Sequence, residues 1–234
     1  MKIIKPLTHK LFLLCLILPL VACSENKDTL AAQSDPAVFT TTVRINENMP
    51  EFTFHRTLRD YVPNFEFSDN ERYISIKITD AKNNLIQEID EIIQGGYGEW
   101  MTADWDIFDI RFDDLNFDGY IDMWLVSAVN PGTASGTWNH FWLWDYEINQ
   151  FVRNEQLENI SGTAWFYVNQ TARQIYVGHR LHNVHHLQEI YEYHNNEFIL
   201  VKTVEYEGWG EHWEITYTDV LTGGIIVETV PFYD

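Results

Sequence analysis

Cysteine is scarce in this 234-residue chain, which has only Cys15 and Cys23. Residues 24–234 therefore contain no thiol, which excludes both a disulfide framework and a cysteine nucleophile from that part of the chain. Without disulfides, a folded domain there depends on its hydrophobic core, on a bound metal, or on both.

Basic residues are also few. Fifteen Lys and Arg stand against 35 Asp and Glu, giving a formal net charge of −20. Binding to nucleic acid requires a basic surface, so we expect no nucleic-acid partner. The acidity suits a cation or a basic protein as partner, although acidity also has the general effect of keeping a protein soluble.

One apolar run stands out near the start of the chain, Leu11–Ala22, and it carries no charge. It is too short for a membrane-spanning helix, which needs roughly 20 apolar residues. Lys2, Lys5 and Lys10 precede it, as in the charged first region of a secretory signal. The sequence therefore predicts export.

The apolar run ends in Leu20-Val21-Ala22-Cys23, which resembles the lipobox of bacterial lipoproteins. The resemblance implies that residues 1–22 are a signal peptide and that Cys23 carries lipid. An Asp after the cysteine often marks retention in the inner membrane, so Ser24 favours the outer membrane. Residues 23–37 are polar and lack periodicity, which predicts a flexible tether. We expect residues 38–234 to form a domain at the periplasmic face of that membrane.

Short alternating or aromatic segments, separated by turn residues, follow from residue 38 onward. This pattern predicts an all-β fold: a compact, antiparallel, hairpin-rich sheet, either propeller-like or sandwich-like. Glu88–Gln94 is compatible with a helical turn instead. The predicted strands are Thr41–Ile45, Tyr73–Ile78, Leu85–Ile89, Ile107–Phe112, Met123–Val129, Phe141–Tyr146, Trp165–Val168, Gln174–Gly178, Leu187–Tyr193, Phe198–Glu205, His212–Tyr217 and Ile225–Val230.

The strongest chemical motif is D-x-N-x-D-G-x-x-D. Its predicted ligands are the side chains of Asp114, Asn116, Asp118 and Asp122 and the carbonyl of Tyr120. Calcium prefers six to eight oxygen ligands from a loop that folds around the ion. The Glu that closes an EF-hand loop is absent, and the flanks suggest strands, so we predict a structural Ca²⁺ site between two strands. A metal-free acidic turn held by its own hydrogen bonds is the alternative.

Residues 112–207 include FDDLNFDGYIDMWLVSA and FWLWDYEINQFVRNEQL. This segment resembles the periplasmic lipoproteins related to inhibitors of invertebrate-type lysozyme. The group includes immunity proteins that neutralise peptidoglycan-cleaving effectors of type IV secretion systems. The resemblance implies a calcium loop, a compact propeller-like all-β fold and an inhibitor-like core at residues 105–207. Residues 41–105 match no family that we recognise.

Inhibitors of this kind insert a loop with a Ser-Gly-x-x-Tyr-like motif into the lysozyme cleft. Here the corresponding loop contains Ser135, Gly136, Thr137 and Trp138, with Trp one position before the expected Tyr. The resemblance implies that these four residues bind the partner. The alternative is an ordinary long hairpin with Trp138 in the core. A second Ser-Gly-Thr-Ala-Trp at residues 161–165 is interpreted as the start of a strand.

These observations together favour a non-enzymatic, calcium-stabilised, membrane-tethered protein that inhibits a lysozyme-like peptidoglycan hydrolase. The sequence has no G-x-S-x-G motif, no P-loop and no carboxylate pair with the context of a general acid and base. The alternative is a structural or scaffolding lipoprotein of the envelope. His182, His185 and His186 have a spacing that suits zinc, but we interpret them as loop or surface residues.

Overall fold

The computed structural model describes residues 37–63, 70–96, 110–130, 136–162 and 164–231. All of these belong to the second of two compact units, Met1–Gln33 and Ser34–Asp234. The predicted signal peptide, Cys23 and nearly all of the predicted tether lie outside the described residues. In the part of the chain that the structure describes, no helix is long and apolar enough to cross a membrane.

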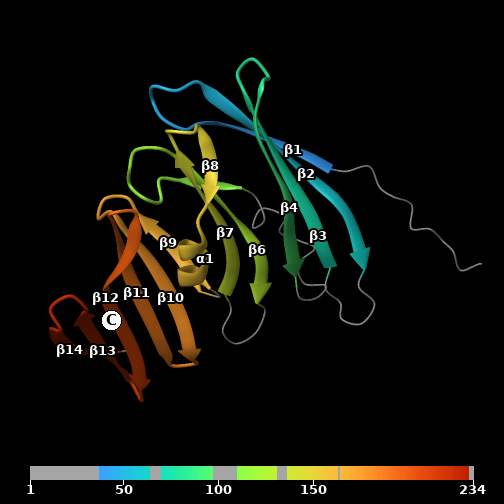
Figure 1. The fold of residues 1–234 in the computed structure, drawn as a ribbon. Coiled ribbons are helices and arrows are strands. Elements are labelled where there is room, and N and C mark those ends of the chain that lie inside the picture. Colours follow the sequence, from blue (N-terminus) through green and yellow to red (C-terminus); the bar gives the residue numbers. More distant parts are fainter. Residues whose placement is uncertain (1–36, 64–69, 97–109, 131–135, 163, 232–234) are drawn as a thin grey trace, which may run out of the picture. The chain divides into compact units, whose positions relative to one another are not determined.

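The prediction of an all-β fold is confirmed (Figure 1). The described residues form fourteen strands and one short helix, α1 (Glu155–Ser161). The strands are β1 (Ala37–Arg44), β2 (Glu51–Pro63), β3 (Asn70–Asp80), β4 (Leu85–Gly96), β5 (Arg111–Asp113), β6 (Asp122–Asn130), β7 (Gly136–Asp145), β8 (Gln150–Arg153), β9 (Trp165–Asn169), β10 (Gln174–His182), β11 (His185–His194), β12 (Glu197–Trp209), β13 (His212–Asp219) and β14 (Ile225–Pro231).

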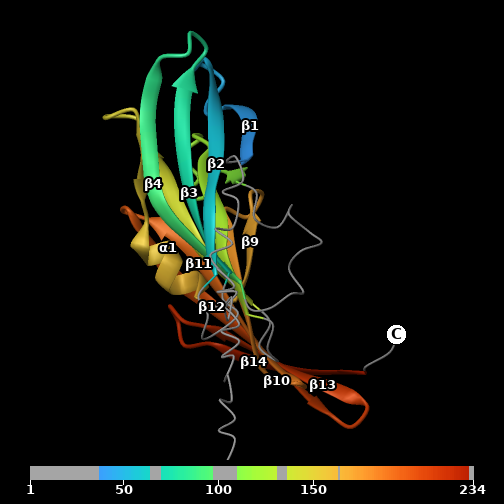
Figure 2. The same ribbon diagram turned by 90° about the vertical axis from the view of Figure 1, so that its right-hand side faces the viewer.

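The strands form two sheets (Figures 1 and 2). The first has the order β1-β2-β3-β4-β6-β7-β8, with β5 paired to β6. Its two halves meet where β4 and β6 run parallel for two residue pairs, and its other pairings are antiparallel. The second sheet is a meander with the order β14-β13-β12-β11-β10-β9, antiparallel throughout.

Local turn chemistry explains several of the hairpins. In the β3–β4 turn, the Asp80 carboxylate accepts hydrogen bonds from the backbone N–H groups of Lys82 and Asn84, both at 2.8 Å. In the β11–β12 turn, Asn195 and Asn196 have φ angles of 51° and 67°. Asn tolerates this left-handed conformation, and two such residues in succession form the turn that matches the twist of paired strands.

A shared hydrophobic core joins the two sheets. Phe141 of β7 and Leu115 of the β5–β6 loop are fully buried and belong to one cluster with Ile175 and Val177 of β10 and Phe198 of β12. Side chains from two sheets that pack into one core define a sandwich-like arrangement. The sandwich-like form of the prediction therefore describes this fold better than the propeller-like form.

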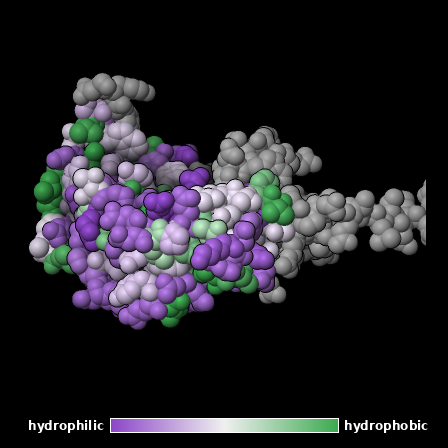
Figure 3. Space-filling model, turned by 90° about the horizontal axis from the view of Figure 1, so that it is seen from above, coloured by the Kyte–Doolittle hydropathy of each residue, from purple (hydrophilic) through white to green (hydrophobic). Residues whose placement is uncertain are grey.

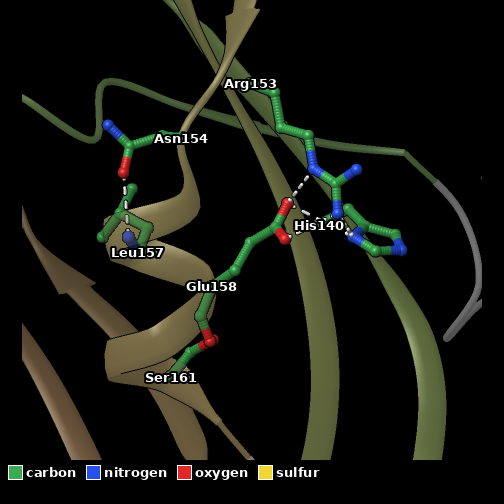
Figure 4. A network of polar contacts seen from close by, with 6 residues as sticks. All are labelled: His140, Arg153, Asn154, Leu157, Glu158 and Ser161. Carbon is green, nitrogen blue, oxygen red and sulfur yellow. Dashed lines mark hydrogen bonds and ion pairs between the residues drawn. The ribbon is translucent and has the colours of Figure 1, made fainter.

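Helix α1 begins at an Asn cap and is held to the first sheet by an ionic network (Figure 4). The Asn154 side chain accepts a hydrogen bond from the Leu157 N–H at 2.8 Å, and Leu157 is fully buried. Glu158 accepts two hydrogen bonds from Arg153, each at 2.8 Å, and lies 3.2 Å from His140 Nδ1. The helix is thereby joined to β7 and to the end of β8.

The helical alternative at Glu88–Gln94 is wrong, because these residues lie within β4. Ile89 pairs with Ile76 and Ile92 pairs with Ile74, and an irregularity in register lies between the two pairs. Such a bulge shifts the normal alternation, so isoleucines three positions apart share one face. Their spacing therefore resembles that of a helix.

Candidate functional site

The acidic loop, residues 114–121, connects β5 to β6 and contains most of the predicted calcium ligands. The Asp114 carboxylate accepts hydrogen bonds from the N–H groups of Asp118 (3.0 Å) and Gly119 (2.9 Å). The Asp118 carboxylate accepts one from the Tyr120 N–H (2.8 Å) and one from the Asn116 amide (2.9 Å). These hydrogen bonds curve the backbone of the loop around the side-chain oxygens, as in an Asx turn.

Gly119 permits the turn at the centre of this loop. Its φ of 87° lies in the region that side-chain-bearing residues rarely adopt, and a Cβ there would have no atom within 4 Å. Glycine is therefore needed at this position for its backbone conformation, and not because a side chain would clash with its surroundings. The glycine that the motif analysis linked to a sharp turn has that role here.

Asp122 is fully buried at the first position of β6. Its two carboxylate oxygens accept hydrogen bonds from the N–H groups of Trp144 (2.7 Å) and Leu115 (2.8 Å). Asp122 therefore connects the start of the acidic loop to β7. Burial raises the pKa of Asp122 to about 8; the two N–H donors oppose this shift, and the charges of Asp118 and Asp114 add to it.

The acidic loop is also attached to the turn between β1 and β2. Asn46 donates a hydrogen bond from its amide to the Gly119 carbonyl at 2.7 Å. The Ile121 N–H donates to the Ile45 carbonyl, also at 2.7 Å. These bonds fix the second half of the loop to the first sheet.

A second attachment comes from the β9–β10 turn of the other sheet. Arg173 donates to the Phe117 carbonyl at 2.7 Å, and Gln170 donates to the Asp114 carbonyl at 2.8 Å. The Gln170 amide also donates to the Asp113 carboxylate. The motif analysis did not identify Gln170 or Arg173, because 56 or 57 residues separate each from its acceptors and no local pattern marks the contact.

The acidic loop concentrates negative charge. Burial raises the pKa of Asp114, and the neighbouring charge of Asp118 raises it further, against the opposing effect of its backbone donors. Burial and the same Asp118 charge raise the pKa of Tyr193, whose phenol faces the loop from β11. A nearby cation would stabilise the charged carboxylates, so the loop is chemically suited to a hard cation.

The donor set that fits a cation is mixed. Among the described residues, no group of three or more His, Cys, Asp and Glu side chains is placed to hold a metal ion. A cation at the acidic loop would therefore also need the side-chain oxygen of Asn116 and the carbonyl of Tyr120. All three carboxylates already accept hydrogen bonds within the protein, but Asp122 is also fully buried, so the side chains of Asp114 and Asp118 would supply most of the charge.

The predicted partner-binding residues lie at the opposite end of the β6–β7 hairpin from the acidic loop. Ser135 lies outside the described residues, and Gly136 is the first residue of β7, paired with Asn130. Trp138 pairs with Ala128 and is 37% exposed, so the alternative that placed Trp138 in the core is wrong. An exposed Trp is a common anchor in protein interfaces.

The second Ser-Gly-Thr-Ala-Trp segment has a structural role. The interpretation of this segment as the start of a strand holds for Trp165, which begins β9, but not for Ser161, which is fully buried at the end of α1, or for Gly162, which caps that helix. The described part of this segment therefore gives no second partner loop.

The three histidines lie at the β10–β11 hairpin. His182 pairs with His185 across the hairpin. His185 interacts with Glu205, whereas His186 contacts the rings of Trp165 and Trp213 at centroid distances of 6.4 and 6.0 Å. Their interactions thus differ, and the interpretation as surface hairpin residues fits them better than a zinc site.

Comparisons with known proteins give one likeness of fold. Neither a protein-family model nor a curated protein matches the sequence. A solved structure, that of a Xanthomonas type IV secretion system related protein, is similar with a TM-score of 0.56 and 15% sequence identity. The match covers 82% of this chain and 99% of that chain. At this identity the likeness concerns the fold alone, so this chain shares its all-β architecture with a type IV secretion system related protein.

Proposed function

We propose that this protein is a lipid-anchored, calcium-stabilised binding protein of the cell envelope that inhibits a lysozyme-like peptidoglycan hydrolase. Cys23 carries the anchor, and the domain lies at the periplasmic face of the outer membrane. The protein is not an enzyme: it acts by occlusion, with Ser135 and the first residues of β7, Gly136–Trp138, entering the substrate cleft of the hydrolase.

The geometry of the β6–β7 hairpin carries this proposal. The acidic loop leads into one end of β6, and the segment leading to Gly136 and Trp138 leaves the other end. Asp122 connects the acidic loop directly to β7 through the Trp144 N–H. A cation at the acidic loop would therefore stabilise the hairpin that presents the partner-binding residues.

The fold comparison supports the proposed setting. The similar solved structure is that of a type IV secretion system related protein. Those systems cross the bacterial envelope, and the sequence resemblance concerned immunity proteins against their peptidoglycan-cleaving effectors. The motif resemblance and the fold comparison thus both refer to type IV secretion systems, while lysozyme inhibition rests on the motif resemblance.

The charge of the chain also supports a basic protein partner. The net charge is −20, and hydrophilic residues predominate on the face that Figure 3 shows. Lysozymes are often cationic, and opposite net charges accelerate association at low salt. Inhibition should therefore weaken as the salt concentration rises.

The test measures hydrolysis of peptidoglycan by a panel of lysozymes and muramidases, with the chain from residue 23 carrying Cys23→Ser added in increasing amounts. We expect inhibition of at least one enzyme and a stable complex with it. Trp138→Ala should weaken inhibition at least about tenfold, the effect of a moderate interface anchor. Trp209→Ala is the matched control, because Trp209 is 64% exposed but lies in β12 of the other sheet.

Failure to inhibit or bind any enzyme in the panel would refute the proposal. Equal inhibition by the Trp138→Ala variant and the wild type would refute the assignment of residues 135–138 as the partner-binding segment. Co-purification with an envelope assembly, without any effect on hydrolases, would instead identify a scaffolding lipoprotein.

A further inference from the structure

Strand β14 lies at the edge of the second sheet (Figures 1 and 2). Within the described residues it pairs with β13 alone, through seven consecutive residue pairs from Thr218–Ile225 to His212–Pro231. In the described part of the chain, the other side of the strand is therefore an unpaired edge. An edge of this kind is a template for pairing with another strand.

The side chains of β14 are apolar and exposed on both faces of the sheet. Ile225, Ile226 and Val227 are 66%, 61% and 55% exposed, although successive side chains point to opposite faces. Natural edge strands are usually protected by Lys, by Pro or by a bulge. Here β14 has no Lys and no irregularity in its pairing with β13, and its single Pro is the last residue, Pro231.

The direction of the backbone groups in β14 follows from the turn that precedes it. The Asp219 N–H donates to the Gly224 carbonyl at 2.8 Å, so the groups of Gly224 face β13. Hydrogen-bonded and non-hydrogen-bonded pairs alternate along an antiparallel ladder. The N–H and C=O groups of Ile225, Val227 and Thr229 therefore point outward, away from β13.

Charge decides which occupant fits this edge. Between Val220 and Val230, Glu228 is the single charged residue, in a chain with a net charge of −20. A basic partner strand would find few carboxylates on this strand, whereas a second acidic copy meets little repulsion there. A partner for an uncharged, apolar edge is another uncharged, apolar edge.

We propose that β14 is a homodimerisation strand, which pairs antiparallel with β14 of a second copy of this chain. In the register centred on Val227, Val227 pairs with its own copy, and Ile225 pairs with Thr229 of the second copy. Glu228 then lies opposite Ile226 of the second copy, so no carboxylates face each other. The outward groups form about six backbone hydrogen bonds between the two copies.

This inference goes beyond the proposed function and does not depend on it. Trp138 lies on β7 of the first sheet, whereas β14 is the far edge of the second. The two experiments can therefore fail separately: a protein that dimerises without inhibiting any hydrolase would support only the dimer.

The overall charge gives the dimer a characteristic salt dependence. The chain from residue 23 lacks Lys2, Lys5 and Lys10 and is more negative than the −20 of the full sequence, so two copies repel each other. Salt screens this repulsion, with a Debye length of about 10 Å at 0.1 M ionic strength. Apolar contacts and backbone hydrogen bonds are not weakened in the same way. Dimerisation should therefore become stronger as salt rises, which is opposite to the effect on a complex with a basic protein.

The test is sedimentation velocity of the chain from residue 23 carrying Cys23→Ser, from about 1 to about 500 µM protein and in about 50 and 500 mM NaCl. We expect a concentration-dependent dimer that is favoured at the higher salt. Val227→Pro should raise the dissociation constant at least about tenfold, because proline removes an outward N–H without removing a bond to β13.

A pair of charge variants keeps the test decisive if Val227→Pro does not fold. Val227→Lys should also abolish the dimer, because it places two lysines opposite each other. Val38→Lys is the matched control, since Val38 is 58% exposed on β1, the edge of the other sheet, and the change in net charge is identical. A monomer under all conditions, a dimer that Val227→Lys leaves intact, or a dimer that salt dissociates would overturn the proposal.

Discussion

Calcium should stabilise this protein through the acidic loop, and the structure sets the scale of the effect. Asp114 and Asp118 would supply most of the charge, because Asp122 is fully buried and its oxygens, like those of the other two carboxylates, already accept hydrogen bonds. So few free carboxylates suggest the weak affinity class of extracellular calcium modules, with dissociation constants of about 10⁻⁴ to 10⁻³ M. At about 10 mM calcium, binding would then contribute about 1.4–2.7 kcal/mol to the free energy of unfolding.

For a domain of this size, each kcal/mol raises the melting temperature by about 2–4 °C. The expected shift at about 10 mM calcium is therefore about 3–10 °C. The assay is thermal unfolding followed by circular dichroism, first in chelator and then along a calcium titration at constant ionic strength. Magnesium should shift the melting temperature less, because this smaller ion demands near-ideal octahedral geometry and gives up its water reluctantly.

The matched variants are Asp118→Asn and Asp80→Asn. Asp118→Asn keeps an oxygen for the Tyr120 N–H but removes a charge, so the calcium-induced shift should fall by more than half. Asp80 also accepts turn N–H groups, yet it lies in the β3–β4 hairpin, so Asp80→Asn should retain the full shift. A melting temperature that calcium does not change in the wild type, or a shift that survives unchanged in Asp118→Asn, would refute the calcium loop.

Two further predictions concern the framework around the sites. Burial disfavours the charged form of Glu158, but the Arg153 hydrogen bonds and the His140 charge outweigh it and lower its pKa below 4.5. This stabilisation is therefore present above pH 4.5 and is lost as the pH falls through the lower pKa of the folded state. Glu158→Gln should lower the free energy of unfolding by about 1–2 kcal/mol at pH 7. In urea unfolding at decreasing pH, the variant should also lose less stability than the wild type. Gly119→Ala forces a side chain into a φ of 87° and should destabilise the metal-free protein by about 1–2 kcal/mol in the same assay, an expectation that an unchanged unfolding midpoint would contradict.

Much of the fold could be predicted because turn residues mark the hairpins. The Asp80–Asn84 segment and the Asn195–Asn196 pair have turn chemistry that is readable from sequence alone, and each connects two strands as expected. Helix α1 was not predicted, because its seven residues are too few to show a helical period. Its Asn cap was visible in the sequence, but one cap without periodicity does not distinguish a helix from a loop.

The site was only partly predictable, for a related reason. The D-x-N-x-D-G spacing identifies the loop because its contacts are local, within a few residues. The partners that hold the loop in place come from distant segments: Asn46 from before β2, and Gln170 and Arg173 from the β9–β10 turn. A single sequence gives no signal for such long-range contacts.

The bonds from Gln170 and Arg173 to the acidic loop have a consequence for protein turnover. They join the acidic loop of the first sheet to the β9–β10 turn of the second sheet. A change that loosens the acidic loop would therefore also release that turn. If a cation holds the loop, then withdrawal of the cation should increase amide hydrogen exchange and protease cleavage at residues 169–174, far along the chain from any ligand. The lifetime of the protein would in that case follow the calcium concentration around it.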